Sequence, residues 1–316
     1  MILHEAIDHY VAWRRTHGAR FITSARALYQ FCKSVSEHVC CDAVTEEEVR
    51  RFLGGAGPLT RWRAGKYGAL AGFYRYAISR GYASRSPLPA ADEEPREPTS
   101  RPPYIYSRKE LQLMFEAVDI SRKHAIRLDS DTFRTLLLIL YGAGLRTSEA
   151  LHLTMSDVDL ANTVLTVRNT KFYKSRLVPV TSQLGNAMRA YAERRSHRPL
   201  PEGMESAFFA NRDGTQVRKY NVDHAFKRLL ETTGISRKDD GRRAPCLHAL
   251  RHTAAVHRLT AWYREGADVH RLLPALSTYL GHASLDGTSV YLSMTPELLH
   301  EASVRFDRYV NGGGHA

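Results

Sequence analysis

The 316-residue chain lacks the features of a disulfide-rich, metal-stapled or membrane-spanning protein. Its four cysteines (Cys32, Cys40, Cys41 and Cys246) form no C-x-x-C pair and no His/Cys metal-ligand spacing. Adjacent Cys40 and Cys41 are poor disulfide partners, so a reducing cytoplasm is expected. The longest apolar run, residues 136–145, is too short to span a bilayer, and the N-terminus lacks an apolar signal core. We therefore expect a cytoplasmic protein without a membrane partner or a resident metal.

Acidic residues are also in short supply. The chain has 45 Lys and Arg against 33 Asp and Glu, which gives a net charge of +12 and a pI near 9.6. A basic surface attracts nucleic acid through counterion release, although charge alone fits a solvated basic surface equally well. The distribution favours DNA, because residues 61–85 contain six cations and no acid. The residues expected to contact DNA are Arg61, Arg63, Lys66, Arg75, Lys174 and Arg176.

The first 85 residues have the pattern of a small helical domain. Apolar periodicity predicts helices within residues 1–15, 21–35, 45–53 and 60–81, and most aromatics of the last are expected in its core. Six prolines then fall between residues 87 and 103, a composition typical of an extended linker. The sequence therefore predicts a helical domain at 1–86, a linker at 87–103 and a larger domain at 104–316.

The larger domain is expected to begin with a helix at Ser107, since Ser107 and Glu110 have capping-box spacing before an apolar run. A strongly apolar helix is predicted at 131–141, ended by Gly142 or Gly144.

Two alternating segments, residues 163–168 and 176–180, predict a β-hairpin in this domain. Pro274 falls inside an apolar helical pattern, where it should kink or restart the helix. Further helices are predicted at residues 183–195, 217–232, 248–264, 269–279, 288–292 and 296–309.

Six polar residues of the larger domain have the chemistry needed to cleave a phosphodiester without a metal ion. Arginine binds two phosphate oxygens with its planar fork and stays protonated. Lysine or histidine can protonate a leaving oxygen, and a tyrosine with a base or cations beside it can attack phosphorus. The six are Arg146 in GLRTSE, Lys171 in TKFYK, His248 and Arg251 in HALR, His282 in LGH, and Tyr291 in SVYLS.

Each of these residues also has an ordinary structural explanation when taken alone. Tyr291 fits a core tyrosine, His282 a helix cap, and Lys171 a turn cation. The order of all six, within apolar helical frames, favours the catalytic interpretation. The remaining histidines, among them His252, His257 and His270, are assigned to structure or solvent.

At these six positions the chain resembles the tyrosine recombinase (phage integrase-like) family, over residues 104–309. The resemblance implies a mainly α-helical protein. It would have an N-terminal core-binding (SAM-like) helical domain, and a mostly α-helical catalytic domain with a small β-hairpin sheet. It also implies an enzyme that needs no cofactor, metal or ATP, because the covalent protein–DNA link conserves the bond energy.

By the same resemblance, Tyr291 is the nucleophile that forms a 3′-phosphotyrosyl bond and frees a 5′-hydroxyl. Lys171 would protonate that hydroxyl, with Lys174 as a competitor for the role, and His248 would help to deprotonate the tyrosine. The phosphate would be held by Arg146, Arg251 and His282. Glu149, one helical turn after Arg146, is expected to orient that arginine.

The expected partner is duplex DNA carrying specific recombination sites, bound by a homo-tetramer or by an assembly with sister recombinases. An integrative or transposable element is the expected context, with the protein associated with the nucleoid. Two alternatives stay open: a type IB topoisomerase-like enzyme that relaxes DNA, and a sequence-specific DNA-binding protein whose catalytic set is vestigial.

Overall fold

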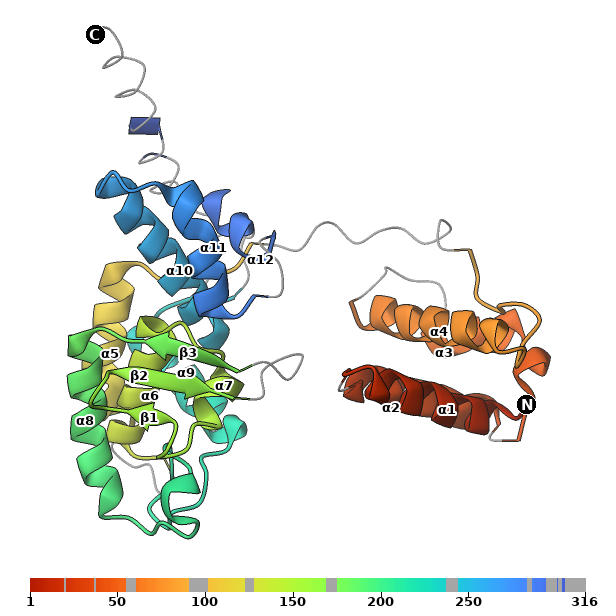
Figure 1. The fold of residues 1–316 in the computed structure, drawn as a ribbon, viewed down its shortest axis with the longest axis horizontal. Coiled ribbons are helices and arrows are strands. Elements are labelled where there is room, and N and C mark those ends of the chain that lie inside the picture. Colours follow the sequence, from red (N-terminus) through yellow and green to blue (C-terminus); the bar gives the residue numbers. More distant parts are fainter. Residues whose placement is uncertain are drawn as a thin grey trace, which may run out of the picture. The chain divides into compact units, whose positions relative to one another are not determined.

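The computed structural model describes residues 1–19, 21–36, 38–54, 61–90, 102–122, 128–168, 175–236, 244–282, 286–293, 300 and 303–304. The side chains of residues 61, 121, 122, 286, 290 and 293 are not part of that description. The chain divides into two compact units, residues 1–100 and 101–316 (Figure 1). Among the described helices, none is long and apolar enough to cross a membrane.

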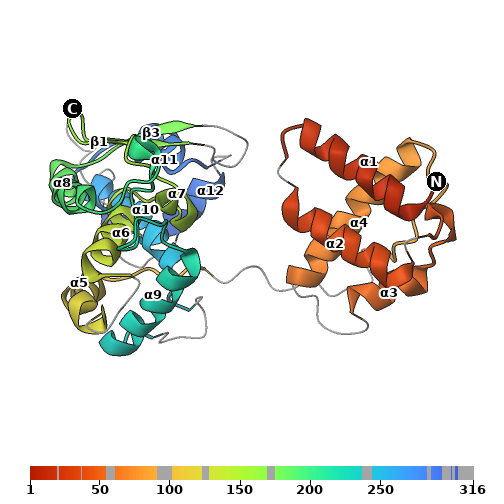
Figure 2. The ribbon, with the colours of Figure 1, turned by 90° about the horizontal axis from the view of Figure 1, so that it is seen from below.

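The N-terminal unit is a bundle of helices that begin and end close to the predicted positions. Its helices are α1 (Leu3–Thr16), α2 (Ile22–Val35), α3 (Glu46–Leu53) and α4 (Arg61–Ser79), with a 3-10 turn at Cys41–Ala43. Thr45 starts α3 with a capping box, in which its side chain accepts from the backbone of Glu48. Helices α1, α2 and α4 pack against one another (Figure 2). Leu28, Phe31 and Phe73 are fully buried in the core of this unit.

The C-terminal unit is also mostly helical, as expected. Ser107 and Glu110 form the predicted capping box, since the Ser107 backbone N–H donates to Glu110 Oε2 at 2.8 Å and the Glu110 N–H donates to Ser107 Oγ at 3.2 Å. The helices are α5 (Arg108–Arg122), α6 (Ser130–Gly142), α7 (Thr147–Leu151), α8 (Ser182–Ser196), α9 (Lys219–Thr233), α10 (Leu247–Arg264), α11 (Val269–Leu280) and α12 (Asp286–Ser289), with 3-10 turns at Gly203–Glu205 and at η4 (Val290–Ser293).

A three-stranded antiparallel sheet lies on this helical unit. Strand β2 (Val164–Val167) pairs with β3 (Arg176–Pro179), which confirms the predicted hairpin strands, and with a short strand β1 (Val158–Asp159) that the sequence did not predict. The register opposes Leu165 to Val178, and both side chains are fully buried in the core. Pairing of Val167 with Arg176 places Arg176 at the first position of β3.

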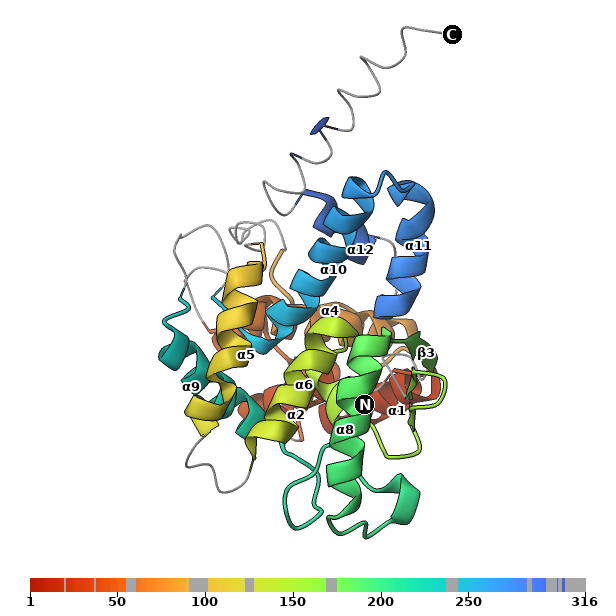
Figure 3. The same ribbon diagram turned by 90° about the vertical axis from the view of Figure 1, so that its left-hand side faces the viewer.

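Helices α10 and α11 form the part of the unit drawn in blue in Figures 1 and 3. Helix α10 packs on α6 and on η4, and α11 packs on α10 and reaches β3. The helix predicted at residues 269–279 is confirmed as α11, and Pro274 lies inside it without restarting it. Because proline lacks only its own N–H, one backbone hydrogen bond is lost while burial of Leu276 and Leu280 supports the rest of the helix.

Candidate active site

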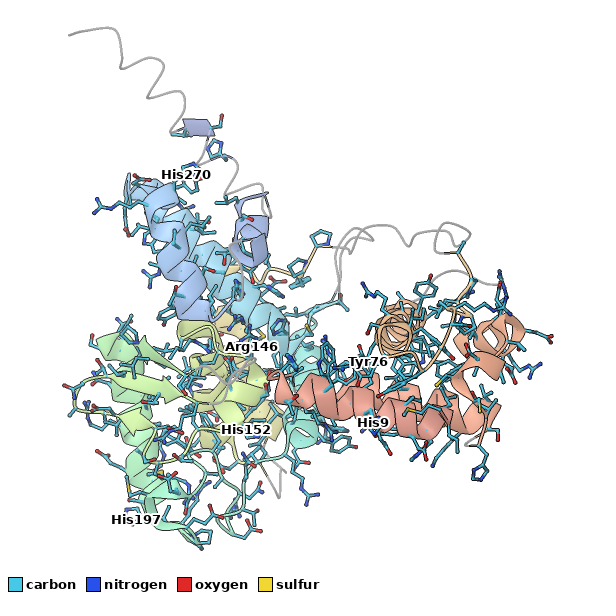
Figure 4. All side chains as sticks on the ribbon, turned by 45° about the vertical axis from the view of Figure 1, so that its right-hand side comes forward. His9, Tyr76, Arg146, His152, His197 and His270 are labelled. Carbon is cyan, nitrogen blue, oxygen red and sulfur yellow. The ribbon has the colours of Figure 1, made fainter. Side chains whose placement is uncertain are left out.

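The site is built where α6 ends and α7 begins. Helix α6 ends at Gly142, and Gly144 follows with φ +61°, a conformation that glycine adopts without strain. Arg146 is then the N-cap residue of α7, and Figure 4 shows it where α10 and α11 meet the sheet-bearing part of the unit. Its backbone N–H donates to Glu149 Oε2 at 3.0 Å, and its Nη1 donates to Glu149 Oε1 at 2.6 Å. Glu149 therefore holds both the backbone and the guanidinium of Arg146.

Glu149 is the centre of an arginine cluster, which we define as Arg146, Arg176 and Arg251. Its carboxylate is 8 % exposed and also accepts from Arg176 Nη2 at 2.9 Å, while Arg251 Nη1 lies 3.9 Å away. Burial raises the pKa of Glu149, but the hydrogen bonds and charges of Arg176 and Arg146 outweigh it and lower this pKa to about 2. The carboxylate is therefore ionised at neutral pH.

The C-terminal end of α11 holds the same three arginines from another side. Its last carbonyl groups have no partner within the helix and carry the negative end of the helix dipole. The Tyr279 carbonyl accepts from Arg176 Nε at 3.0 Å, and the Gly281 carbonyl accepts from Arg146 Nη2 at 2.9 Å. Between them, the Leu280 carbonyl accepts from Arg251 Nη2. One helix end thus fixes three guanidinium groups.

Arg251 is the most buried member of the cluster, with 2 % of its surface exposed. It extends from α10, and its Nη1 donates to the Gly144 carbonyl at 2.8 Å. Burial lowers the pKa of Arg251 to about 10, and the neighbouring charge of Arg146 acts in the same direction. The guanidinium still carries its proton at neutral pH.

Arg176 requires a correction. The sequence grouped it with the DNA contacts, but its side chain is only 10 % exposed and both ends of its guanidinium bind Glu149. Its Nη1 lies where a side chain at Gly281 would be, since a Cβ built there would approach Nη1 to 2.7 Å. Arg176 therefore belongs to the framework of the site and not to an exposed DNA-facing surface.

His282 follows Gly281, whose φ of +68° ends α11. Its Nδ1 lies 2.7 Å from Thr288 Oγ1, and Thr288 is fully buried. Burial lowers the pKa of His282 to about 4, and the positive charges of Arg251 and Arg146 act in the same direction. The imidazole is therefore neutral near pH 7.

Tyr291 lies in η4, with 2 % of its surface exposed. Its hydroxyl is 2.8 Å from His252 Nδ1, and its ring is centred 6.0 Å from the ring of His282. Burial raises the pKa of Tyr291, while the charges of Arg251 and Arg146 oppose that shift. The predicted nucleophile is therefore in electrostatic range of the arginine cluster.

Two of the three histidines of α10, His248 and His252, differ from expectation. The sequence assigned proton removal to His248 and left His252 to structure or solvent. The structure places His252 against the phenol, and the His248 ring packs edge-on against His252 at 4.6 Å. Residues four apart share a helix face, so the spacing from His248 was a usable signal.

The remaining predicted residues are Lys171, Lys174 and four residues of α4. Lys171 and Lys174 lie outside the described residues, as does the side chain of Arg61. Arg63 is half-buried on α4 and Arg75 is exposed. The Lys66 ammonium donates to the Phe52 carbonyl at 2.8 Å and lies 4.3 Å from the centre of the Phe52 ring. Over the described part of the chain, no group of His, Cys, Asp and Glu has an arrangement that could hold a metal ion.

A helical unit that surrounds a buried tyrosine with fixed arginines and histidines defines the class of tyrosine-dependent DNA strand-transfer enzymes. A family model described as the phage integrase family matches residues 107–297. The chain belongs to this family, and it is a tyrosine-type site-specific DNA recombinase.

Individual relatives agree with that placement. The chain is 33 % identical over 311 residues to a protein of Sinorhizobium fredii that carries the name of a candidate integrase/recombinase, y4rE, covering 98 % of this chain and 97 % of the relative. It is 31 % identical to the tyrosine recombinase XerC of Chlorobaculum tepidum, covering 89 % and 86 %.

The solved structure of the Tn1549 transposon integrase in complex with transposon right end DNA has a similar fold. The TM-score is 0.68 at 17 % identity, covering 98 % of this chain and 99 % of that one. A lambda integrase dimer bound to a COC' core site gives a TM-score of 0.63 at 16 % identity, covering 92 % and 77 %. The mainly α-helical fold predicted from the sequence is therefore confirmed.

Proposed function

We propose that this recombinase cuts and rejoins duplex DNA by attack of Tyr291 on a backbone phosphate held by Arg146 and Arg251. The proposal rests on one observation: Tyr291 is buried within electrostatic range of Arg146 and Arg251. Both arginines are held by Glu149 and by the end of α11. Three guanidinium groups and one carboxylate leave two positive charges, which favour an incoming phosphodiester and the charge that develops on its oxygens. Pre-fixed donors need little reorganisation during the reaction.

The arrangement also supports separate roles for the residues around the phosphate. Arg146 is the more exposed arginine of the pair, at 30 % against 2 % for Arg251, so it would meet the phosphate first. The Nδ1 of neutral His282 is paired with the Thr288 hydroxyl, and in the tautomer with its proton on Nε2 that N–H would donate to a phosphate oxygen. Lys171 is proposed as the acid for the leaving 5′ oxygen, with Lys174 as its competitor.

The N-terminal unit supplies a second surface suited to the DNA backbone. A hollow of about 760 Å³ lies between α1, α2 and α4, lined by Arg14, Arg75 and Arg80 and by no carboxylate of the described residues. The Arg14 Nε is buried there without a hydrogen-bond partner. Gly68 also lines the hollow, and no atom lies within 4 Å of a Cβ added there. A DNA backbone can therefore approach α4 closely at this position. We propose residues 1–86 as the DNA-clamping domain, residues 87–103 as its linker and residues 104–316 as the catalytic domain.

We further propose a mobile-element context and a tetrameric assembly on two DNA sites. Similarity to a transposon integrase and to a phage integrase dimer, both solved with DNA, supports duplex DNA as the partner. Residues 296–309, predicted as a helix, are proposed to pack between neighbouring protomers; most of them lie outside the described residues.

The test uses nicked duplexes made from the DNA that flanks the gene, since a nick near the cleavage site lets the freed strand diffuse away. We expect a protein–DNA adduct that survives denaturant, and its loss in Tyr291→Phe. Tyr220→Phe is the matched control, because that ring is 74 % exposed. An adduct that persists in Tyr291→Phe would refute the assignment. Relaxation of supercoiled plasmid without exchange between two sites would favour the topoisomerase-like alternative.

A further inference from the structure

The contact that the sequence did not anticipate is the one made by the nucleophile itself. The Tyr291 hydroxyl and His252 Nδ1 are 2.8 Å apart, and the two rings are centred 5.5 Å from each other. Tyr291 is buried and His252 is half-buried, so bulk water is a poor competitor for this hydrogen bond. A phenol placed here needs a proton acceptor at hand, because burial disfavours its anion.

The surrounding residues are less suited to accept that proton. The Nδ1 of His282 is engaged with Thr288, and its pKa of about 4 makes it a weak base. Arg251 and Arg146 are cations that stabilise a phenolate but cannot take its proton. The His248 ring packs edge-to-face against His252, whose Nδ1 is the atom 2.8 Å from the phenol oxygen.

We propose that His252 is the catalytic base of this recombinase, an inference that rests on Tyr291 being the nucleophile. With its own proton on Nε2, the imidazole accepts the Tyr291 hydroxyl proton at Nδ1 as the Oη–P bond forms. The P–O5′ bond breaks with its electron pair on O5′, which is protonated by a separate acid, the role proposed for Lys171. His252 ends the step as an imidazolium beside the new phosphotyrosine.

Rejoining uses the same contact in reverse. The 5′-hydroxyl of a DNA strand attacks phosphorus and loses its proton to the Lys171 position, and the Oη–P bond breaks. The imidazolium of His252 returns its proton to the departing phenolate oxygen. His248 is assigned the position of a supporting ring against His252.

The experiment measures the rate of adduct formation on the nicked duplex with His252→Gln. Glutamine can still accept a hydrogen bond from the phenol but cannot take its proton at neutral pH. His257→Gln is a matched control, because His257 lies on the same helix as His252 and also contacts a tyrosine hydroxyl. Its Nδ1 is 2.9 Å from the hydroxyl of Tyr141, which lies outside the arginine cluster. We expect about a 100-fold or greater loss in His252→Gln, the scale of general base catalysis. We expect no more than a few-fold change in the control.

Chemical rescue separates proton removal from simple support of the fold. A ring-fluorinated tyrosine at position 291 has a more acidic phenol and should raise the rate of adduct formation by His252→Gln at least tenfold. A substrate with sulfur in place of the 5′ bridging oxygen supplies a better leaving group and should not restore it. Circular dichroism and DNA affinity check folding, and His252→Asn replaces His252→Gln if that variant does not fold.

The outcomes are distinguishable from failure of the proposed function. A wild-type adduct on Tyr291 with an unchanged rate in His252→Gln would overturn the role of His252 alone. Rescue by the sulfur substrate instead of the fluorinated phenol would also overturn it, because His252 would then serve the leaving group. An adduct that survives Tyr291→Phe would instead defeat the proposed function.

Discussion

Replacing Glu149 with glutamine should reveal how strongly the arginine cluster depends on one carboxylate. A pKa lowered from 4.5 to about 2 for a side chain 8 % exposed means that the folded state favours the ionised form. At about 1.4 kcal/mol for each pKa unit, the charge contributes roughly 3 kcal/mol to the free energy of unfolding at pH 7. Glu149→Gln removes that contribution and leaves buried Arg251 without its nearest carboxylate.

The stabilisation by Glu149 should depend on pH. Because the pKa of Glu149 is lower in the folded protein, its stabilisation is complete above the unfolded pKa and is lost as pH falls towards 2. The difference in unfolding free energy between wild type and Glu149→Gln should therefore shrink from roughly 3 kcal/mol at pH 7 to about 1 kcal/mol near pH 3.

Urea unfolding of both proteins at several pH values measures this difference. Glu193→Gln, at an exposed position of α8, is the matched control and should change stability by less than about 0.5 kcal/mol. Equal stability of Glu149→Gln and wild type at pH 7, or a difference independent of pH, would refute the reasoning. Adduct formation should also fall in Glu149→Gln, since Arg146 loses the partner that orients it.

Three further predictions follow from other parts of the structure. Gly281→Ala should destabilise the fold by about 1–2 kcal/mol and slow cleavage, because φ is +68° and the new Cβ would lie 2.7 Å from Arg176 Nη1. The control is Gly266→Ala, which has φ +73° and no atom within reach of its Cβ, and therefore the same backbone strain without the clash. Equal effects of the two substitutions on cleavage would argue against a role for the Gly281–Arg176 contact. DNA affinity should fall steeply with salt, and Arg75→Ala should reduce the log–log slope by about 1, whereas an unchanged slope would remove the α4 hollow from the interface. Cleavage measured in EDTA should keep its rate, and a strict Mg²⁺ requirement would contradict a mechanism carried by arginine, histidine and lysine alone.

The helices were largely predictable because their signals are local. Thr45 and Ser107 cap helices through side chains three residues from their partners, and apolar periodicity marks the buried faces of α6 and α10. Pro274 interrupts the apolar pattern of α11 without ending the helix, because burial of Leu276 and Leu280 supports the turns that follow it.

The composition of the candidate site was predictable, but its internal contacts were not. Residue chemistry pointed to Arg146, Arg251 and Tyr291, and spacing pointed to Glu149. The position of Arg176 depends on the register of β3, and the partner of Tyr291 depends on how η4 packs on α10. Both are long-range contacts that no local pattern specifies, and these produced the revised roles of Arg176 and His252.

The central claim is that Tyr291 becomes covalently joined to DNA. Mass spectrometry of the adduct, after nuclease and protease digestion, identifies the modified residue directly. The account predicts a nucleotide attached through its 3′-phosphate to the peptide containing Tyr291. A nucleotide on Tyr279 or Tyr263, or one linked through its 5′-phosphate, would contradict it.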